Sequence, residues 1–334
     1  MTDMTPPPFT GKDLDPQILR FQTLMAEGFG RFPAVGTVTI PEARAIAEQV
    51  RAPWTAGGPV MGRTQTLTID GNGLSVRVRC HEPHPGGSAP ALIYLHGGGW
   101  TLFSIDTHDR VMREYAGRTG MVVVGVDYAL APEAKFPTAI EQIALVVGWL
   151  RDHGAGLGID PARLAIGGDS AGGNLAVATC LALRDQGLGG AIHAMVLNYG
   201  VFDCDLTTPS YRRFGGAGHM LETGEMAAFW QNYLRDDGDR RNPLACPLQA
   251  DLRDLPAAFM AVAEQDVLYD ENMAMAEKLR QAGVPVAVIV YPGTGHSFLE
   301  AVSLAAVSSS AFDDAATWLK HRFALGIGAE APSI

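Results

Sequence analysis

The sequence predicts an α/β protein in which a mostly parallel central sheet is flanked by helices. Short apolar runs of strand length alternate with helical stretches along most of the chain, and this alternation is typical of βαβ crossovers. Of the 334 residues, 47% are hydrophobic and 18% are charged, so the chain can bury a large core and is not disordered. The longest apolar runs are strand-sized, and none reaches the roughly 18 residues of a membrane helix.

The N-terminal part is predicted to hold two helices and a hairpin. The helices cover Asp15–Arg31 and Pro41–Arg51, and the second has proline at its first position. Thr64–Ile69 and Leu74–Cys80 alternate in polarity on either side of the turn Asp70–Gly73, as half-buried strands do. This hairpin is expected to add an antiparallel edge to the sheet.

The remaining elements alternate regularly except over one segment. The predicted strands are Ala91–Leu95, Met121–Val126, Arg163–Ile166, Ala194–Asn198, Ala257–Ala263 and Val284–Tyr291. The predicted helices are His108–Thr119, Thr138–Asp152, Ala171–Asp185, Glu271–Ala282 and Ser303–Phe323. From about Phe202 to Pro256 no strand follows, and Leu221–Leu234 has a helical pattern. This insertion and the N-terminal helices could fold over one end of the sheet; the alternative is a surface excursion with its own small core.

Charge and cysteine content restrict the expected partners and compartment. The chain carries 25 Lys and Arg against 36 Asp and Glu, a net charge of −11. Nucleic acids and anionic membranes select for basic surfaces, so neither is an expected partner. The first residues, MTDMTPPPFTGKD, lack the basic end and apolar run of a signal peptide. Because the cysteines (Cys80, Cys180, Cys204 and Cys246) are far apart in the sequence, we expect reduced, mostly buried thiols in a cytoplasmic protein without a metal site.

The strongest chemical signal is the pentapeptide Gly168–Gly172, which reads Gly-Asp-Ser-Ala-Gly. It follows a predicted strand and opens a predicted helix, where a G-x-S-x-G sequence makes a tight corner that exposes the serine hydroxyl. Ser170 is therefore the candidate nucleophile. The alternative is a plain glycine-rich turn in which Ser170 caps the helix.

A second glycine-rich loop, His96–Trp100, ends the strand Ala91–Leu95. Its three consecutive glycines leave backbone N–H groups uncovered, as an oxyanion hole requires. The alternatives are a flexible loop or a phosphate cradle. The Lys-Ser/Thr ending of a P-loop and the spacing of a dinucleotide fingerprint are both missing from this loop.

A serine nucleophile needs an oriented base, and His296 is the best placed of the histidines. It lies just past the last predicted strand, at the sheet end where active groups of open α/β sheets collect. His96 is expected to anchor the glycine loop. Of the others, His108, His153, His193 and His321 are expected to be surface or capping residues, and His81, His84 and His219 lie in loops without a predicted role.

The acid that orients the base should lie between serine and histidine in chain order. Asp266 begins the loop after the strand Ala257–Ala263, with Glu264 as its nearest competitor. Asp270 and Glu271 are expected to cap the next helix, because carboxylates are favourable at a helix N-terminus. Asp266 would hold the His296 tautomer and stabilise the imidazolium.

Together these motifs make the chain resemble the hormone-sensitive-lipase-like (family IV) esterases of the α/β-hydrolase fold. The matching segments run from about Ala91 to Phe298 and are His96–Trp100, Asp127–Glu133, Gly168–Gly173, Asp266–Glu271 and Gly295–Phe298. Val267 and Thr294 depart from residues that are common in the family, and neither departure removes a catalytic group.

The resemblance implies a role for each motif and a division of the chain. Ser170 would be the nucleophile, His296 the base and Asp266 the acid, and the amides of Gly98, Gly99 and Ala171 would form the oxyanion hole. Residues 1–55 would form the N-terminal helical part of a cap and residues 204–255 a cap insertion. The α/β-hydrolase core would then comprise residues 56–203 and 256–334.

The function expected from the residues and the resemblance is cofactor-free hydrolysis of small-molecule carboxylic esters of short to medium chain length. Five aromatic residues could wall the substrate pocket or could be plain cap core: Trp100, Tyr211, Phe214, Phe229 and Trp230. The alternatives are an arylformamidase-like amidase with the same triad and a non-catalytic ligand-binding protein of this fold. An exposed edge strand at Val284–Tyr291 could pair two subunits into a homodimer.

Overall fold

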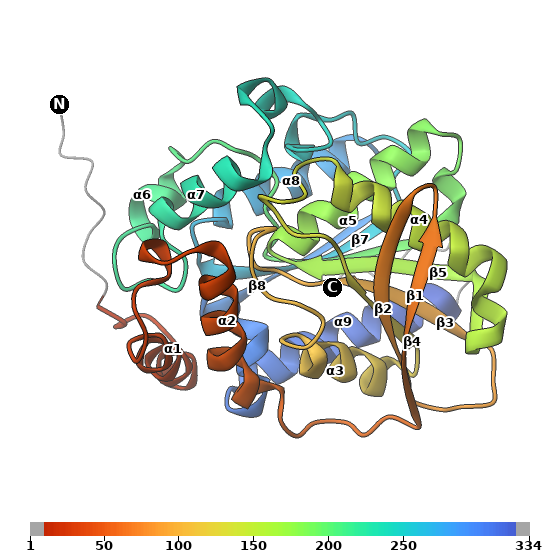
Figure 1. Cartoon of the computed structure of the whole chain (residues 1–334), viewed down its shortest axis with the longest axis horizontal. Helices are drawn as coiled ribbons and strands as arrows, with labels where there is room; N and C mark the ends of the chain where they lie inside the picture. The colour runs from red at the N-terminus through yellow and green to blue at the C-terminus, as the bar shows by residue number, and fades with distance from the viewer. Residues whose placement is uncertain (1–9, 325–334) are drawn as a thin grey trace.

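One sheet of eight strands runs through the centre of the computed structural model, which describes residues 10–324 (Figure 1). In chain order the strands are β1 (Arg63–Gly71), β2 (Leu74–Glu82), β3 (Ala89–Leu95), β4 (Val122–Asp127), β5 (Ile159–Asp169), β6 (Ala194–Asn198), β7 (Ala257–Gln265) and β8 (Val286–Gly295). Their spatial order is β1-β2-β4-β3-β5-β6-β7-β8. All pairs from β4 to β8 are parallel, whereas β2 pairs antiparallel with both β1 and β4. The predicted mostly parallel sheet with a hairpin at one edge is confirmed.

Helices cover both faces of the sheet. They are α1 (Pro16–Phe29), α2 (Ile40–Arg51), α3 (Asp109–Thr119), α4 (Thr138–His153), α5 (Ala171–Asp185), α6 (Pro209–Phe214), α7 (Thr223–Tyr233), α8 (Tyr269–Gln281) and α9 (Ala306–Ala324). Successive residues of β3 point to opposite faces, so Ile93 packs in the layer of α4, α5 and α8 while Leu92 and Tyr94 pack in the layer of α3 and α9. The near-continuous apolar strands of the sequence therefore follow from burial on both sides.

The hairpin between β1 and β2 closes through a two-residue turn. Gly71 pairs with Leu74, and the residues between them, Asn72 and Gly73, have φ angles of 53° and 77°. Positive φ at both central residues matches the right-handed twist of the flanking strands, which explains the Asn-Gly sequence at this point.

Helices α1 and α2 lie at the same end of the molecule as α6 and α7 (Figure 1). As expected, no strand occurs within residues 204–255, and α7 falls inside the predicted helix Leu221–Leu234. The C-terminal end of α7 is tied to the core, because Phe136 N–H donates to the Tyr233 carbonyl (2.9 Å) and Lys135 Nζ to the Leu234 carbonyl (2.7 Å). The parts of the predicted divisions that comprise residues 1–9 and 325–334 lie outside the described residues.

Strand β8 forms the edge of the sheet opposite the hairpin, as its sequence predicts. One side of its backbone is thus free of strand pairing, and the homodimer stays a prediction. Within residues 10–324, every helix is too short or too polar to cross a membrane.

Candidate active site

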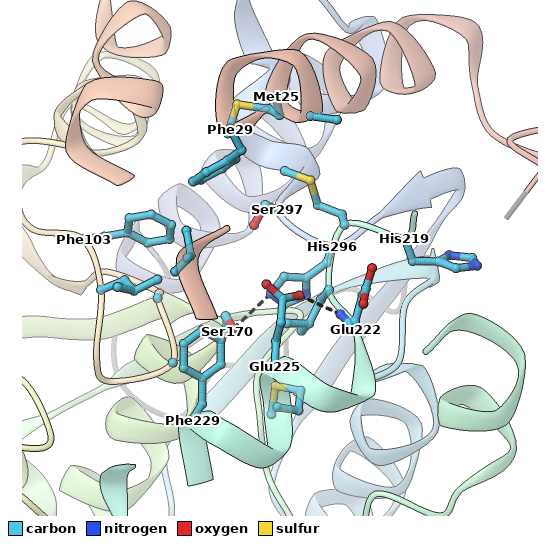
Figure 2. A pocket seen from close by; sticks show the side chains of 18 of the residues that line it. Met25, Phe29, Phe103, Ser170, His219, Glu222, Glu225, Phe229, His296 and Ser297 are labelled. Carbon is cyan, nitrogen blue, oxygen red and sulfur yellow. Dashed lines mark hydrogen bonds between the residues drawn. The ribbon is translucent and has the colours of Figure 1, made fainter. Parts of the chain in front are cut away.

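Ser170, His296 and Asp266 form a continuous hydrogen-bonded chain. His296 Nε2 lies 3.0 Å from Ser170 Oγ (Figure 2), and His296 Nδ1 lies 2.7 Å from Asp266 Oδ2. The three residues directly follow or closely follow β5, β8 and β7, so the carboxyl ends of three parallel strands bring them together. All three are buried. The geometry is that of a nucleophile next to a base that a carboxylate orients.

The backbone at Ser170 is strained in a way that its neighbours permit. Ser170 has φ 53° and ψ −119° between the end of β5 and the start of α5, a region that non-glycine residues rarely occupy. The corner packs against β3, where a Cβ added at Gly168 or Gly172 would overlap the Leu95 carbonyl oxygen. The two flanking glycines are therefore required by this close approach.

The competing acidic residues have other partners. Asp266 Oδ1 accepts a hydrogen bond from Leu268 N–H (3.0 Å), which fixes the carboxylate towards His296. Glu264 Oε2 instead accepts from Gly293 N–H at 2.8 Å. Asp270 and Glu271 lie in the first turn of α8 as expected, and each also accepts backbone N–H groups of the segment after β6. Among these four carboxylates, Asp266 is the one bonded to His296.

Three backbone amides are free beside the serine. Gly98 and Gly99 follow β3 with φ angles of 107° and 58°, and Ala171 is the first residue of α5. None of the three amides donates a hydrogen bond to another described residue. Unpaired N–H groups next to the nucleophile are what a developing oxyanion needs.

Asp169 connects the serine corner to the glycine loop from behind. Its Oδ1 accepts hydrogen bonds from Tyr94 Oη (2.8 Å) and Gly97 N–H (3.2 Å), and its Oδ2 lies 3.3 Å from His108 Nε2. Burial favours the neutral acid, but the charge and hydrogen bond of His108, together with Tyr94, outweigh it and lower the pKa of Asp169. His108 does occupy the N-cap position of α3, but its side chain makes no capping hydrogen bond. The prediction of a surface side chain is wrong, because its ring is buried against this carboxylate.

His96 is held inside the glycine loop. Its Nδ1 lies 2.7 Å from the Gly97 carbonyl oxygen, and its ring stacks on Tyr128 at 4.3 Å between centroids. Burial, aided by the nearby charge of His108, lowers the pKa of His96 to about 4. These contacts suit the anchoring role expected from the sequence.

The lowered pKa of His96 predicts a loss of stability in acid. Because the folded-state pKa of His96 is below that of the unfolded chain, the unfolded chain takes up a proton first as the pH falls. The free energy of unfolding should therefore decrease by about 3 kcal/mol through this residue between about pH 7 and about pH 4. Guanidinium chloride unfolding of the wild type and of His96→Asn at both pH values measures how much free energy of unfolding each protein loses as the pH falls. Equal losses in the two proteins would contradict the prediction.

A cavity of about 450 Å³ opens beside Ser170. Its apolar wall comes mostly from α1 and from the loops after α1 and β3; it includes Met25, Phe29, Val35, Leu102 and Phe103. The segment containing α7 supplies a mixed wall of Met220, Leu221, Met226 and Phe229 together with His219, Glu222 and Glu225. An apolar cavity with a few polar groups is the usual form of a small-molecule site.

Glu225 and Arg51 are two of the charged side chains that line the cavity. Glu225 extends from α7 on the side of His296 (Figure 2), and its desolvation outweighs the hydrogen bond from Glu222 N–H and raises the pKa of Glu225. Arg51 at the end of α2 is buried in an ion pair with Glu300 and lies 4.1 Å from the centroid of the Phe103 ring. Burial lowers the pKa of Arg51 to about 10.

Of the five aromatic residues predicted to wall the pocket, only Phe229 lines this cavity. Trp100 stacks on Tyr233 at 4.2 Å and lies 4.6 Å from Trp230, so both tryptophans belong to a buried aromatic cluster. Tyr211 is buried in the same core, and Phe214 borders a separate surface depression with Arg213. For these four residues the expected place in the pocket wall is not met and the alternative of plain core holds, because their rings belong to the buried hydrophobic core and do not line the cavity.

Several cavity residues were missed by the sequence analysis. Met25 and Phe29 are four residues apart in α1. This spacing predicts an apolar helix face, but it does not predict what that face covers. His219 lies in a loop for which the sequence predicts no role, and Glu222 and Glu225 form the capping box at the start of α7. No sequence signal separates these residues from plain cap surface.

One group of described side chains is spaced as metal ligands are, and it lies away from Ser170. The potential ligand atoms of Asp203, Cys204 and Cys246 all lie within 4.8 Å of one another. These residues flank the cap insertion and do not line the cavity.

Comparisons with known proteins agree with this geometry. A family model described as the alpha/beta hydrolase fold matches residues 92–300. An acetyl esterase of Salmonella paratyphi A is 35% identical over 297 residues, which are 88% of this chain and 90% of that protein. A hyperthermophilic esterase from the archaeon Pyrobaculum calidifontis superposes with a TM-score of 0.86 at 32% identity, over 92% of this chain and 98% of that one. A thermostable esterase from Pseudomonas putida superposes with a TM-score of 0.86 at 33% identity, over 94% of this chain and 99% of that one.

Proposed function

Since this chain belongs to the hormone-sensitive-lipase-like esterases of the α/β-hydrolase fold, we propose that it hydrolyses short- to medium-chain carboxylic esters through Ser170, His296 and Asp266. That it is a carboxylesterase follows from the family. The catalytic triad and the size of the substrate are the proposal. The observation that carries it is the hydrogen-bonded chain from Ser170 to Asp266 beside three unpaired amides.

In the first half of the reaction, Ser170 Oγ attacks the ester carbonyl carbon while His296 Nε2 takes the hydroxyl proton. The negative charge that develops on the carbonyl oxygen is stabilised by the amides of Gly98, Gly99 and Ala171. Asp266 keeps the proton of His296 on Nδ1 and stabilises the imidazolium. Collapse of the tetrahedral intermediate breaks the ester C–O bond, and His296 protonates the leaving alcohol.

In the second half, water replaces the alcohol. His296 takes a proton from the water, whose oxygen attacks the acyl-enzyme carbonyl, and the same amides stabilise the oxyanion. Breaking the bond to Ser170 releases the carboxylic acid and returns the proton to the serine. Every proton is moved by His296, so the cycle needs no further group of the protein.

The size of the cavity supports short and medium acyl chains. About 450 Å³ must hold both the acyl and the alcohol part of the ester, which is too little for a triglyceride with three long chains. Initial rates on p-nitrophenyl esters from acetyl to palmitoyl are expected to peak at short or medium chain length. A maximum at palmitoyl would contradict the proposed size, and serine-dependent rates on amides but not on esters would assign the triad to an amidase.

A further inference from the structure

Two cysteines far apart in the sequence meet where the cap segment, residues 204–255, leaves and rejoins the core. Cys204 stands at its beginning and Cys246 near its end, and their sulfur atoms lie within 4.8 Å of each other. Cys204 is half-buried, whereas Cys246 is buried. The four cysteines are far apart in the sequence, so this pair is a product of the fold.

The two chain segments that carry these thiols are hydrogen-bonded to each other. Leu248 N–H donates to the Phe202 carbonyl at 2.9 Å, and Gln249 Nε2 donates to Asp203 Oδ1 at 3.0 Å. Cys204 Sγ also donates a hydrogen bond to the Arg240 carbonyl oxygen at 3.6 Å, and Arg240 belongs to the same cap segment. The thiols are therefore kept close by their surroundings and do not meet by chance rotation of two surface side chains.

Each of these two hydrogen-bonded segments is also anchored to the core, the first through α8 and the second through α5. Glu271 of α8 accepts hydrogen bonds from Phe202 N–H (2.9 Å) and Asp203 N–H (2.7 Å). Asn174 of α5 donates from Nδ2 to the Ala245 carbonyl at 2.9 Å. Both helices begin next to catalytic loops, so the position of the thiol pair is linked to the part of the core that holds Ser170 and Asp266.

Cys204 differs in reactivity from the other cysteines. The hydrogen bond with Cys204, together with burial, raises the pKa of Cys246. Cys80 and Cys180 are buried in the core, and burial raises the pKa of each thiol to about 12. Cys204 is partly open to solvent, and the hydrogen bond from the Cys246 thiol lowers the pKa of Cys204. Because the thiolate is the nucleophile in exchange reactions, Cys204 is the cysteine that an oxidant should reach first.

We propose that Cys204 and Cys246 are an oxidisable thiol pair whose disulfide closes the neck of the cap segment. The Cys204 thiolate attacks a low-molecular-weight disulfide, forms a mixed disulfide and releases one thiolate of the reagent. The Cys246 thiol then loses its proton to solvent as its sulfur attacks the Cys204 sulfur, which forms the protein disulfide and releases the second thiolate. The protein loses two hydrogens, and one molecule of reagent disulfide is reduced to two thiols. This proposal does not depend on the catalytic assignment.

The expected consequence is a more rigid cap. The disulfide would close a loop of roughly 40 residues that contains α6 and α7, and a constraint on the unfolded chain of this size stabilises the folded state. Helix α7 supplies Met226 and Phe229 to the cavity, so the cross-link also limits movement of one cavity wall. We expect Tm to rise by about 5 °C on oxidation.

The test is performed on the full chain after reduction and removal of the reductant. Oxidised glutathione is added at neutral pH, and intact mass, thiol titration in denaturant and peptide mapping are recorded with Tm. The expected product has lost two hydrogen atoms, retains two of its four thiols and contains a peptide linked through Cys204 and Cys246. Dithiothreitol should reverse both the mass change and the rise in Tm.

Matched variants separate this pair from the other thiols. Cys204→Ser and Cys246→Ser should each abolish the linkage and the rise in Tm, whereas Cys180→Ala should retain both. Stable glutathione adducts without the linkage, a disulfide between two molecules, or a linkage that leaves Tm unchanged would each overturn the proposal. Retention of Zn²⁺ by the reduced pair, with no disulfide formed under oxidant, would overturn it in favour of metal binding.

Discussion

Replacing Ser170 with alanine is expected to lower kcat on p-nitrophenyl acetate by about 10⁶-fold. The substitution removes the only atom of the triad that bonds to the substrate, while His296, Asp266 and the oxyanion amides stay in place. Residual activity would come from those amides and from substrate binding alone. The variant should fold normally, because Ser170 Oγ has His296 as its hydrogen-bonding partner and fills little volume.

The measurement is the initial rate of wild type and Ser170→Ala over a range of substrate concentrations, with Tm recorded for both. Ser88→Ala is a matched control, because Ser88 is an exposed serine in the loop before β3, and it should retain wild-type kcat. A Ser170→Ala variant within tenfold of wild-type activity would exclude Ser170 as the nucleophile.

Replacing Asp266 with asparagine is expected to lower kcat by about 10⁴-fold while leaving the fold intact. The carboxylate accepts the Nδ1 proton of His296 at 2.7 Å and a backbone N–H from Leu268 at 3.0 Å. An asparagine can keep the bond to Leu268 through its carbonyl oxygen, but its amide group then faces Nδ1 as a donor. The proton of His296 would move to Nε2, and the ring could no longer accept the proton of Ser170.

Glu264→Gln is the matched control for this variant. Glu264 lies two residues earlier and accepts a hydrogen bond from Gly293 N–H and none from His296, so a glutamine at this position should support nearly wild-type kcat. Comparison of kcat and KM for both variants decides between the carboxylates. Loss of turnover in Glu264→Gln with retention in Asp266→Asn would show that the acid has been assigned wrongly.

Much of the site could be predicted because its signals are local in the chain. Ser170, Asp266 and His296 each follow a recognisable strand, and the parallel sheet brings the carboxyl ends of these strands to one edge. The glycine loop after β3 could be identified for the same reason. When a predicted strand ends in a loop that carries a serine, a histidine or consecutive glycines, the sequence predicts both the position of that loop in the fold and its expected chemistry.

The cavity walls, by contrast, were decided by packing. Trp100 and Trp230 looked as suitable for a pocket as Phe229, yet the first two pack against Tyr233 and only the third faces the serine. His108 stands at the start of α3, as its sequence suggests, but its ring is buried against Asp169. The apolar or polar character of a residue predicts that it will be covered or hydrated, but not which neighbour covers it.

The sequence alone therefore determined the order of strands and helices along the chain, the parallel core and the three residues that we propose as the reacting groups. Tertiary structure alone decided which face of α1 and of α7 lines the cavity and that Cys204 meets Cys246 across the neck of the cap. The physical reason is that hydrophobic burial has no direction. A local pattern specifies the period of an element and its buried side, whereas the partner of that side depends on how distant elements pack together.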